Sequence, residues 1–200
     1  IAEYRGLRIL RQDPWECLVS FICSANSNIP RISASMVSLA KNYGRPLKLD
    51  DYADYSFPSP EKLAEAEEKA LRDLKLGFRA KYVAKAAERV ALGEVKLEPL
   101  RDIPYQEAKD ALTSIAGVGD KVADCVLLFS LDKLDACPID RWVRRALEEW
   151  YLDGKRLSYA KLRKWAVEYF GPDASYAQQY LFHGSRLDKV GRVVVGRPAD

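Results

Sequence analysis

The sequence predicts an all-α protein with two helical lobes flanking a cleft. Apolar residues recur at helical spacing along nearly the whole chain, and the alternation typical of strands is almost absent. The one β-like run, 192–195, is too short to build a sheet on. A chain of 200 residues is long enough to bury a substantial core, so such lobes are physically feasible.

The first half of the chain shows the helical pattern most clearly in the segment that begins at Pro14. Asp13 is a good N-cap there, and proline is well tolerated in the first turn of a helix. One stripe of this helix carries the apolar residues Trp15, Leu18, Val19, Ile22 and Cys23. Further helices are expected from Pro30 to about Gly44, over 60–65 and 69–74, and from Ala80 to about Leu92, with a polar connection over 45–60.

The second half continues the pattern and adds a glycine-rich turn. Helices are predicted over 104–115 and 121–130, with Gly117-Val118-Gly119 between them. No repeat or obvious linker interrupts the chain, so one domain over 1–200 is the expected organisation. The remaining helices are expected to start at Asp140 and to run over about 158–169 and 173–185.

The glycine turn predicts a helix-hairpin-helix motif over about 104–130. Its two glycines allow the backbone to turn tightly and to approach a partner closely, while the first amides of the next helix form an anion site. For an isolated Gly-x-Gly, a plain turn without a ligand would be the better interpretation. Here four apolar residues at core spacing favour a hairpin that grips a DNA phosphate: Leu112, Ile115, Val118 and Val122.

Two ionisable residues near this motif are candidates for chemistry. The apolar neighbours of Lys121 predict partial desolvation, which makes a neutral, nucleophilic amine available. A solvent-facing or phosphate-binding lysine is the alternative. Asp140 follows Pro138 and reads equally well as the N-cap of the next helix. A carboxylate at a helix start is held rigidly, so capping and catalysis are compatible.

Composition narrows the protein class. A net charge of +3 permits a nucleic-acid partner without requiring one. No apolar run approaches the roughly 18 residues of a membrane span, so no membrane association is expected. The four cysteines form no CxxC pair and there is one histidine, which argues against a metal site. Reduced thiols in an intracellular protein, in the cytoplasm, nucleoid or nucleus, are the expectation.

The motifs together resemble a known enzyme family. The segment from Leu112 to Asp140 looks like the helix-hairpin-helix DNA glycosylase superfamily, with its Gly-Val-Gly hairpin, lysine and downstream aspartate. Three further stretches, 12–29, 76–82 and 119–125, narrow the resemblance to the 8-oxoguanine DNA glycosylase/AP lyase family. The similarity covers nearly the whole chain, in order.

This resemblance implies a bifunctional glycosylase acting as a monomer on double-stranded DNA that contains oxidised guanine. The damaged nucleotide is flipped into the cleft. Lys121 attacks C1′ and displaces 8-oxoguanine lying opposite cytosine, and the Schiff base that forms permits β-elimination of the 3′ phosphate. Asp140 stabilises the positive charge that develops on the sugar. Neither a metal nor an organic cofactor is implied, although a monovalent cation has room at the hairpin.

The resemblance also assigns the pocket for the flipped base. Cys125 and Phe182 match the positions that sandwich it, Gln178 matches one that recognises its Watson–Crick edge, and Phe129 completes the pocket. Cys125 and Phe182 have a plain alternative, since residues of these types are more often ordinary core in a helical protein.

A second group matches residues that contact the opposite strand. Asn26 corresponds to the residue that fills the vacated stack, Arg31 and Arg79 to arginines that hydrogen-bond the estranged cytosine, and Phe78 to a wedge usually occupied by tyrosine. Asn26 has an alternative role as a helix C-cap. Arg79 has the donors needed to hydrogen-bond a base edge.

Some features depart from the family pattern. Trp142 stands where the family often has a histidine near a DNA phosphate, and no stretch of this sequence resembles the N-terminal β-rich domain of better-known members. The chain starts at Ile1, so a trimmed protein and a naturally short one are both open interpretations.

A related glycosylase of different base preference and a non-catalytic helix-hairpin-helix module remain alternatives. The lack of cysteine in 171–200 argues against the iron–sulfur relatives.

Overall fold

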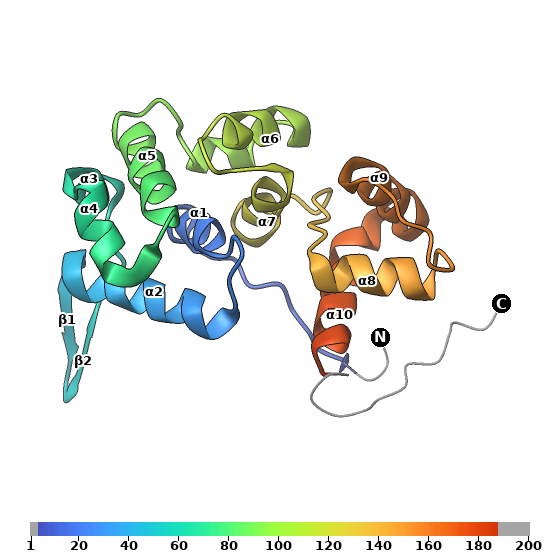
Figure 1. Ribbon diagram of the computed structural model, residues 1–200, viewed down its shortest axis with the longest axis horizontal. Coiled ribbons are helices and arrows are strands. Elements are labelled where there is room, and N and C mark those ends of the chain that lie inside the picture. The colour runs from blue at the N-terminus through green and yellow to red at the C-terminus, as the bar shows by residue number, and fades with distance from the viewer. Residues whose placement is uncertain (1–3, 188–200) are drawn as a thin grey trace.

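The protein is helical through most of residues 4–187, the part of the chain that the computed structural model describes (Figure 1). This confirms the predicted all-α class. The α-helices are α1 Pro14–Cys23, α2 Ile29–Tyr43, α3 Pro60–Glu65, α4 Glu68–Leu71, α5 Arg79–Ala91, α6 Tyr105–Thr113, α7 Asp120–Ser130, α8 Arg141–Trp150, α9 Tyr159–Phe170 and α10 Ala174–Leu187.

The first lobe contains α1 to α7 around one apolar core. Its largest fully buried side chains include Leu18, Ile22, Leu112 and Leu127. α1 packs against α5 and α7, and α6 packs against α7, which places the helix that follows the glycine turn at the centre of the lobe. The predicted stripe of α1 is buried throughout, and Asp13 caps the helix by accepting a hydrogen bond from the Glu16 amide at 2.9 Å.

The second lobe contains α8, α9 and α10 around a separate, smaller core (Figure 1). Val143, Leu147 and Leu162 are buried there, and α10 packs against both α8 and α9. Two cores in one chain correspond to the two lobes that the sequence predicts. The segment 131–140 links them and leads directly into α8.

The connection over 45–60 is the clearest departure from the prediction. It contains an antiparallel hairpin of two strands, β1 Pro46–Leu49 and β2 Tyr52–Tyr55, which projects from the body below α2 (Figure 1). Leu49 pairs with Tyr52, so Asp50 and Asp51 form the turn. All eight strand residues are exposed. Because neither face of the hairpin is buried, nothing requires apolar and polar residues to alternate along its strands, and alternation is the pattern by which a strand is recognised in a sequence.

Smaller differences occur elsewhere. The helix expected over 69–74 ends as α4 at Leu71 and continues as a wider π-helical turn over Arg72–Leu76, where Lys75 has φ +66°. The short run 192–195 lies outside the described residues. Among residues 4–187, no helix is both long enough and apolar enough to cross a membrane.

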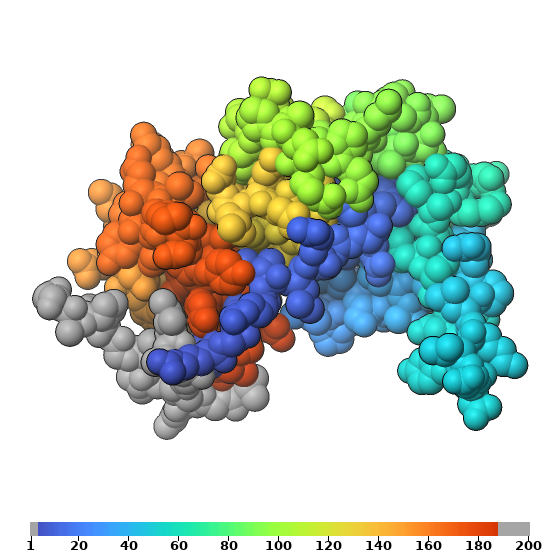
Figure 2. Space-filling view, turned by 180° about the vertical axis from the view of Figure 1, so that it is seen from behind, coloured from blue at the N-terminus to red at the C-terminus, as the bar shows by residue number. Residues whose placement is uncertain are grey.

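The chain before α1 contributes to the junction of the lobes. Figure 2 shows this segment passing between the first lobe and the second on the face opposite to that of Figure 1. The Tyr4 ring meets the His183 ring of α10 edge-on at 4.9 Å, and the Gln12 amide donates to the Phe129 carbonyl of α7 at 2.8 Å. One extended segment therefore contacts both lobes.

Candidate active site

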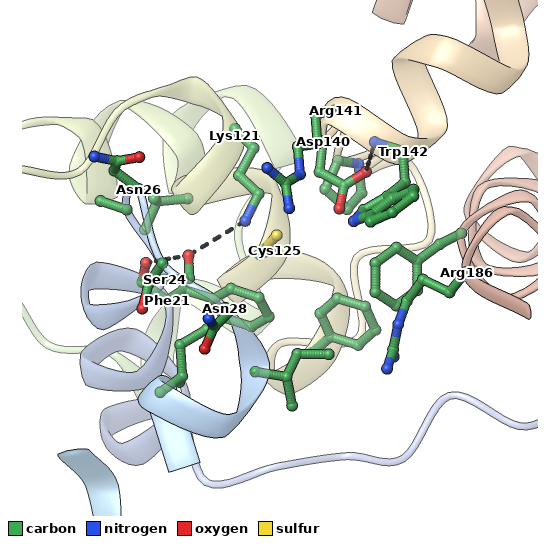
Figure 3. Close-up of a pocket in the computed structure, with 18 of the residues that line it drawn as sticks. Phe21, Ser24, Asn26, Asn28, Lys121, Cys125, Asp140, Arg141, Trp142 and Arg186 are labelled. Atoms are coloured by element: carbon green, nitrogen blue, oxygen red, sulfur yellow. Dashed lines mark hydrogen bonds between the residues drawn. The ribbon is translucent and has the colours of Figure 1, made fainter. Parts of the chain in front are cut away.

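A cavity of about 740 Å³ opens between the two lobes (Figure 3). The first lobe contributes the end of α1, the loop into α2 and one face of α7, and the second contributes the start of α8 and a face of α10. Neither lobe encloses the space alone. The sequence-predicted residues that line it are Asn26, Lys121, Cys125, Phe129, Asp140, Gln178 and Phe182.

Lys121 projects into this cavity from the first turn of α7. It is half-buried, as predicted, and its Nζ lies 3.4 Å from Ser24 Oγ and 5.0 Å from the centre of the Phe21 ring (Figure 3). Among the described residues, no carboxylate forms an ion pair with this amine. An amine that touches a hydroxyl and an aromatic face, and that is free of a fixed counter-ion, is suited to nucleophilic attack.

Asp140 is the N-cap of α8 and also lines the cavity. Its Oδ1 accepts hydrogen bonds from the amides of Trp142 at 2.8 Å and Val143 at 2.9 Å. Its Oδ2 accepts none from the described residues. One oxygen therefore fixes the carboxylate to the helix, while the other is left for a ligand, so capping leaves a second function open.

The four residues assigned to the base pocket all line this cavity, and Cys125 lies one turn along α7 from Lys121. Cys125 and Gln178 are buried, whereas Phe129 and Phe182 are half-buried and belong partly to the two cores. Burial raises the pKa of the Cys125 thiol to about 12, with Lys121 opposing the rise, so the thiol is neutral. Gln178 Oε1 is buried without a hydrogen-bond partner among the described residues, an arrangement that invites a donor from a ligand.

The four residues expected to contact the opposite strand lie together at the edge of the site. Arg79 is 4% exposed and donates to the carbonyls of Ala25, Asn26 and Leu76. Burial and the nearby Arg31 charge lower its pKa. In this structure Arg79 thus holds the loop that carries Asn26, and its hydrogen bond to cytosine stays a prediction.

The other members of this edge cluster are open to solvent. Asn26 is exposed and adopts φ +48°, a left-handed conformation that asparagine tolerates better than most residues. The C-cap of α1 is Ser24, so the alternative role for Asn26 is wrong. Arg31 is exposed, and Phe78, half exposed, places its ring 4.6 Å from the Arg79 guanidinium. Of the four, Asn26 reaches the cavity lining.

The glycine hairpin joins α6 to α7 outside the cavity lining. Gly117 has φ +88°, and a Cβ there would lie 2.5 Å from Tyr82 Cγ, so both backbone and packing require glycine. Gly119 has φ −94°, and a Cβ added there would meet no atom within 4 Å, so the fold does not require glycine at this position. Val118 is 5% exposed, in agreement with its place among the apolar residues at core spacing.

The structure adds cavity residues that motif reasoning left without a role: Phe21, Ser24, Arg141 and Arg186. Phe21 and Ser24 lie nearly one hundred positions from Lys121, a separation that no local pattern reveals. The Arg141 guanidinium lies 5.3 Å from the Trp142 ring and that of Arg186 lies 5.3 Å from the Phe182 ring. Neither arginine forms an ion pair with a described residue.

Metal-binding groups are not apparent in the described part of the chain. Residues 4–187 hold no cluster of three or more histidine, cysteine or acidic side chains placed to share an ion. The four cysteines are buried and unpaired. The cavity presents an amine, a carboxylate, side-chain amides, a thiol, hydroxyls, two guanidinium groups and aromatic faces.

The family of the chain follows from comparison with known proteins. Residues 19–172 match the family model of the HhH-GPD superfamily of base excision DNA repair proteins. The chain belongs to the HhH-GPD superfamily. The match spans α2 to α9 and includes the glycine hairpin, Lys121 and Asp140.

Individual HhH-GPD relatives confirm the resemblance found in the motifs. The chain is 37% identical over 189 residues to an N-glycosylase/DNA lyase of Arabidopsis thaliana, covering 89% of this chain and 52% of that protein. It is 39% identical over 159 residues to an N-glycosylase/DNA lyase of Saccharomyces cerevisiae, covering 74% and 42%. The chain thus spans about half the length of these two relatives.

A solved HhH-GPD structure shows the same fold. The Clostridium acetobutylicum 8-oxoguanine glycosylase/lyase, in complex with double-stranded DNA containing cytosine opposite to 8-oxoguanine, superposes with a TM-score of 0.88 at 40% identity. The superposition covers 92% of this chain and 63% of that one.

Proposed function

We propose that this chain is a bifunctional DNA glycosylase/AP lyase that excises 8-oxoguanine lying opposite cytosine. The observation that carries the proposal is the meeting of Lys121 and Asp140, from different lobes, in one cavity. A volume of about 740 Å³ is of the size that holds a nucleotide-sized ligand. The activities of the two N-glycosylase/DNA lyase relatives and of the 8-oxoguanine enzyme support the same reaction.

The proposed chemistry uses the two charged groups in sequence. The Lys121 amine attacks C1′ of the flipped nucleotide as the glycosidic bond breaks, and the proton that the amine loses is taken up by the departing base. Asp140 Oδ2, held by the fixed cap, stabilises the positive charge that spreads over C1′ and the ring oxygen. The C1′–O4′ bond then breaks, O4′ keeps its electron pair and takes up the remaining amine proton, and C1′ becomes doubly bonded to the Lys121 nitrogen as a Schiff base. Loss of a C2′ proton then breaks the C3′–O bond and releases the 3′ phosphate.

Recognition of the base draws on both lobes, with Gln178 and Phe182 from α10 and Cys125 from α7. The unpartnered Gln178 Oε1 accepts a hydrogen bond from the edge of the flipped base, and Phe182 and Cys125 enclose its faces. Asn26 and the edge cluster around Arg31, Phe78 and Arg79 contact the opposite strand. Since a buried acceptor without a donor is costly, this arrangement favours a base that supplies one.

The expected partner is double-stranded DNA bound by a monomer inside the cell. The hairpin amides around Gly119 contact a backbone phosphate, and the cavity arginines add positive charge. The chemistry draws on an amine and a carboxylate, so it calls for no metal or organic cofactor; a monovalent cation between the hairpin and the phosphate is compatible with it.

Borohydride trapping tests this proposal. Reduction of the Schiff base should give a covalent complex with duplex DNA carrying 8-oxoguanine opposite cytosine. Lys121→Gln should abolish the adduct, while Lys161→Gln, an exposed lysine on α9, should leave it intact. Binding without any adduct would indicate a non-catalytic module. An adduct with other lesions but none with 8-oxoguanine would indicate a glycosylase of different base preference.

A further inference from the structure

A fully buried carboxylate lies one turn beyond Lys121 on α7, outside the cavity lining. Asp124 has no exposed surface. Tyr105 donates to its Oδ1 at 2.5 Å and Tyr159 donates to its Oδ2 at 2.7 Å. Lys109 Nζ lies 3.4 Å from Oδ1 and Arg163 Nε lies 3.5 Å from Oδ2. Two phenols and two cations therefore surround one acid in the protein interior.

The cluster joins helices of both lobes. Tyr105 and Lys109 belong to α6 of the first lobe, whereas Tyr159 and Arg163 belong to α9 of the second. Burial and the negative charge of Asp124 raise the pKa of both phenols, which keeps them protonated as donors. The Arg163 guanidinium also packs 4.4 Å from the Tyr105 ring, which adds a contact between the lobes. Directional hydrogen bonds to one carboxylate thus set how α9 sits against α7.

One member of the cluster reaches the backbone next to Asp140. The Tyr159 hydroxyl, which donates to Asp124, also accepts a long hydrogen bond from the Ile139 amide at 3.5 Å. The path therefore runs from α7, which carries Lys121, through Asp124 and Tyr159 to the residue that precedes Asp140. Tyr105 donates to the same carboxylate from within the first lobe and has no such link.

We propose that Asp124, acting through Tyr159, is a positioning residue that sets where Asp140 lies relative to Lys121 across the two lobes. The inference rests on the proposed function for what the pair does, although the link itself is independent of activity. Reacting groups must be held within a fraction of an ångström of a productive arrangement, and Lys121 and Asp140 stand on separately packed lobes. A cross-lobe hydrogen-bonded link supplies that constraint.

A role limited to stability predicts similar effects when either phenol hydroxyl of the cluster is lost, whereas a positioning role does not. If the cluster served only to satisfy a buried charge, loss of either phenol hydroxyl would remove one hydrogen bond to Asp124 and would have a similar consequence. A positioning role singles out Tyr159, because only this hydroxyl of the two also contacts the segment that leads into Asp140.

The test compares three single-atom deletions in the full chain: Tyr159→Phe, Tyr105→Phe and, as a matched control in the second lobe, Tyr151→Phe. Each variant is measured for single-turnover cleavage of 8-oxoguanine DNA at saturating enzyme, affinity for a tetrahydrofuran abasic-site duplex, thermal midpoint, and amide hydrogen exchange of residues 137–143. Tyr159→Phe should slow the single-turnover rate by about tenfold or more, because a small misplacement of reacting groups is costly. Its affinity should remain near wild type, exchange in 137–143 should rise, and Tyr105→Phe and Tyr151→Phe should show neither change.

Equal losses of rate in Tyr159→Phe and Tyr105→Phe, in proportion to a lowered thermal midpoint, would overturn the proposal in favour of simple stabilisation. A wild-type rate in Tyr159→Phe would also overturn it. If the wild-type protein itself cleaves no 8-oxoguanine DNA, the proposed function fails, and the exchange data still decide the link: unchanged exchange in 137–143 of Tyr159→Phe would contradict it.

Discussion

The two lobes contribute different kinds of residue to one cavity. The first lobe, which holds the larger core, provides the Lys121 amine and the glycine hairpin. The second provides the Asp140 carboxylate and Gln178. In the proposed function, the nucleophile and the phosphate-binding hairpin thus come from one lobe and charge stabilisation from the other, while base recognition uses Gln178 of the second lobe and Cys125 of the first.

The separation of Lys121 and Asp140 therefore depends on how the two cores are joined. The packing of either lobe alone fixes only half of the site, so small changes in their relative placement alter the separation of Lys121 and Asp140. Single substitutions in each lobe therefore test what that lobe contributes.

Removing the charge of Asp140 should reduce glycosylase activity by a far larger factor than removing its N-cap reduces the stability of the fold. Asp140→Asn keeps an oxygen for the Trp142 and Val143 amides but removes the charge, so single-turnover glycosylase activity should fall about 10²- to 10³-fold. The thermal midpoint should stay near wild type. Asp140→Ala should also lose about 1 kcal/mol of stability with the cap. Full activity in Asp140→Asn would reduce this residue to a helix cap.

The two hairpin glycines should respond in opposite ways. Gly117→Ala should destabilise the first lobe by about 1–3 kcal/mol, because φ +88° is strained for alanine, and the contact with Tyr82 adds to this. Gly119→Ala should leave the thermal midpoint unchanged but weaken DNA binding, since its Cβ would occupy the space that a phosphate needs. Chemical denaturation and fluorescence anisotropy measure the two effects. Equal DNA affinity in wild type and Gly119→Ala would argue against a phosphate at this position.

Gln178 should control which base is excised more than whether DNA is bound. Replacing it with alanine removes the unpartnered Oε1, so the preference for 8-oxoguanine over other lesions should fall by about tenfold, the effect of one hydrogen bond. Competition between lesion duplexes in a single reaction measures this ratio. A Gln179→Ala variant, at the neighbouring lining residue, provides the control. An unchanged ratio in Gln178→Ala would exclude it from recognition.

Substitution of Arg141 should have the smallest effect, which should be limited to the electrostatic part of DNA affinity. It lines the cavity with no carboxylate partner among the described residues, whereas Arg145, one turn along α8, pairs with Glu149 at 2.7 Å. Arg141→Ala should weaken binding to all sequences alike and reduce the slope of log affinity against log salt by about 1. Arg145→Ala should leave the slope unchanged. Identical slopes in both variants would show that Arg141 meets no phosphate.

Local signals predicted the helices and pointed to Lys121 and Asp140, whereas the family resemblance assigned the other predicted cavity residues, among them Cys125, Gln178 and Phe182. The α1 stripe, the Asp13 cap and the glycine turn are patterns within a few residues. The hairpin over 46–55 was not predicted because both of its faces are exposed, and burial therefore imposes no alternation of apolar and polar residues on its strands.

The contacts that sequence could not predict are long-range. The approach of Lys121 to Ser24 and Phe21 depends on how α1 packs on α7. The engagement of Arg79 with the Ala25 and Asn26 carbonyls depends on a loop conformation that its own helix does not determine. The Asp124 cluster was missed because an acid next to the motif cysteine gives no sign of burial until α6 and α9 are in place.

The most direct test of the account is to find the atom that attacks the sugar. The wild-type protein should be trapped with borohydride on duplex DNA carrying 8-oxoguanine opposite cytosine, digested, and the modified peptide sequenced by mass spectrometry. We expect a reduced deoxyribose remnant on Lys121 and on no other amine. A remnant on a different lysine or on the chain's terminal amine would contradict the assignment of the nucleophile to the cavity between the two lobes.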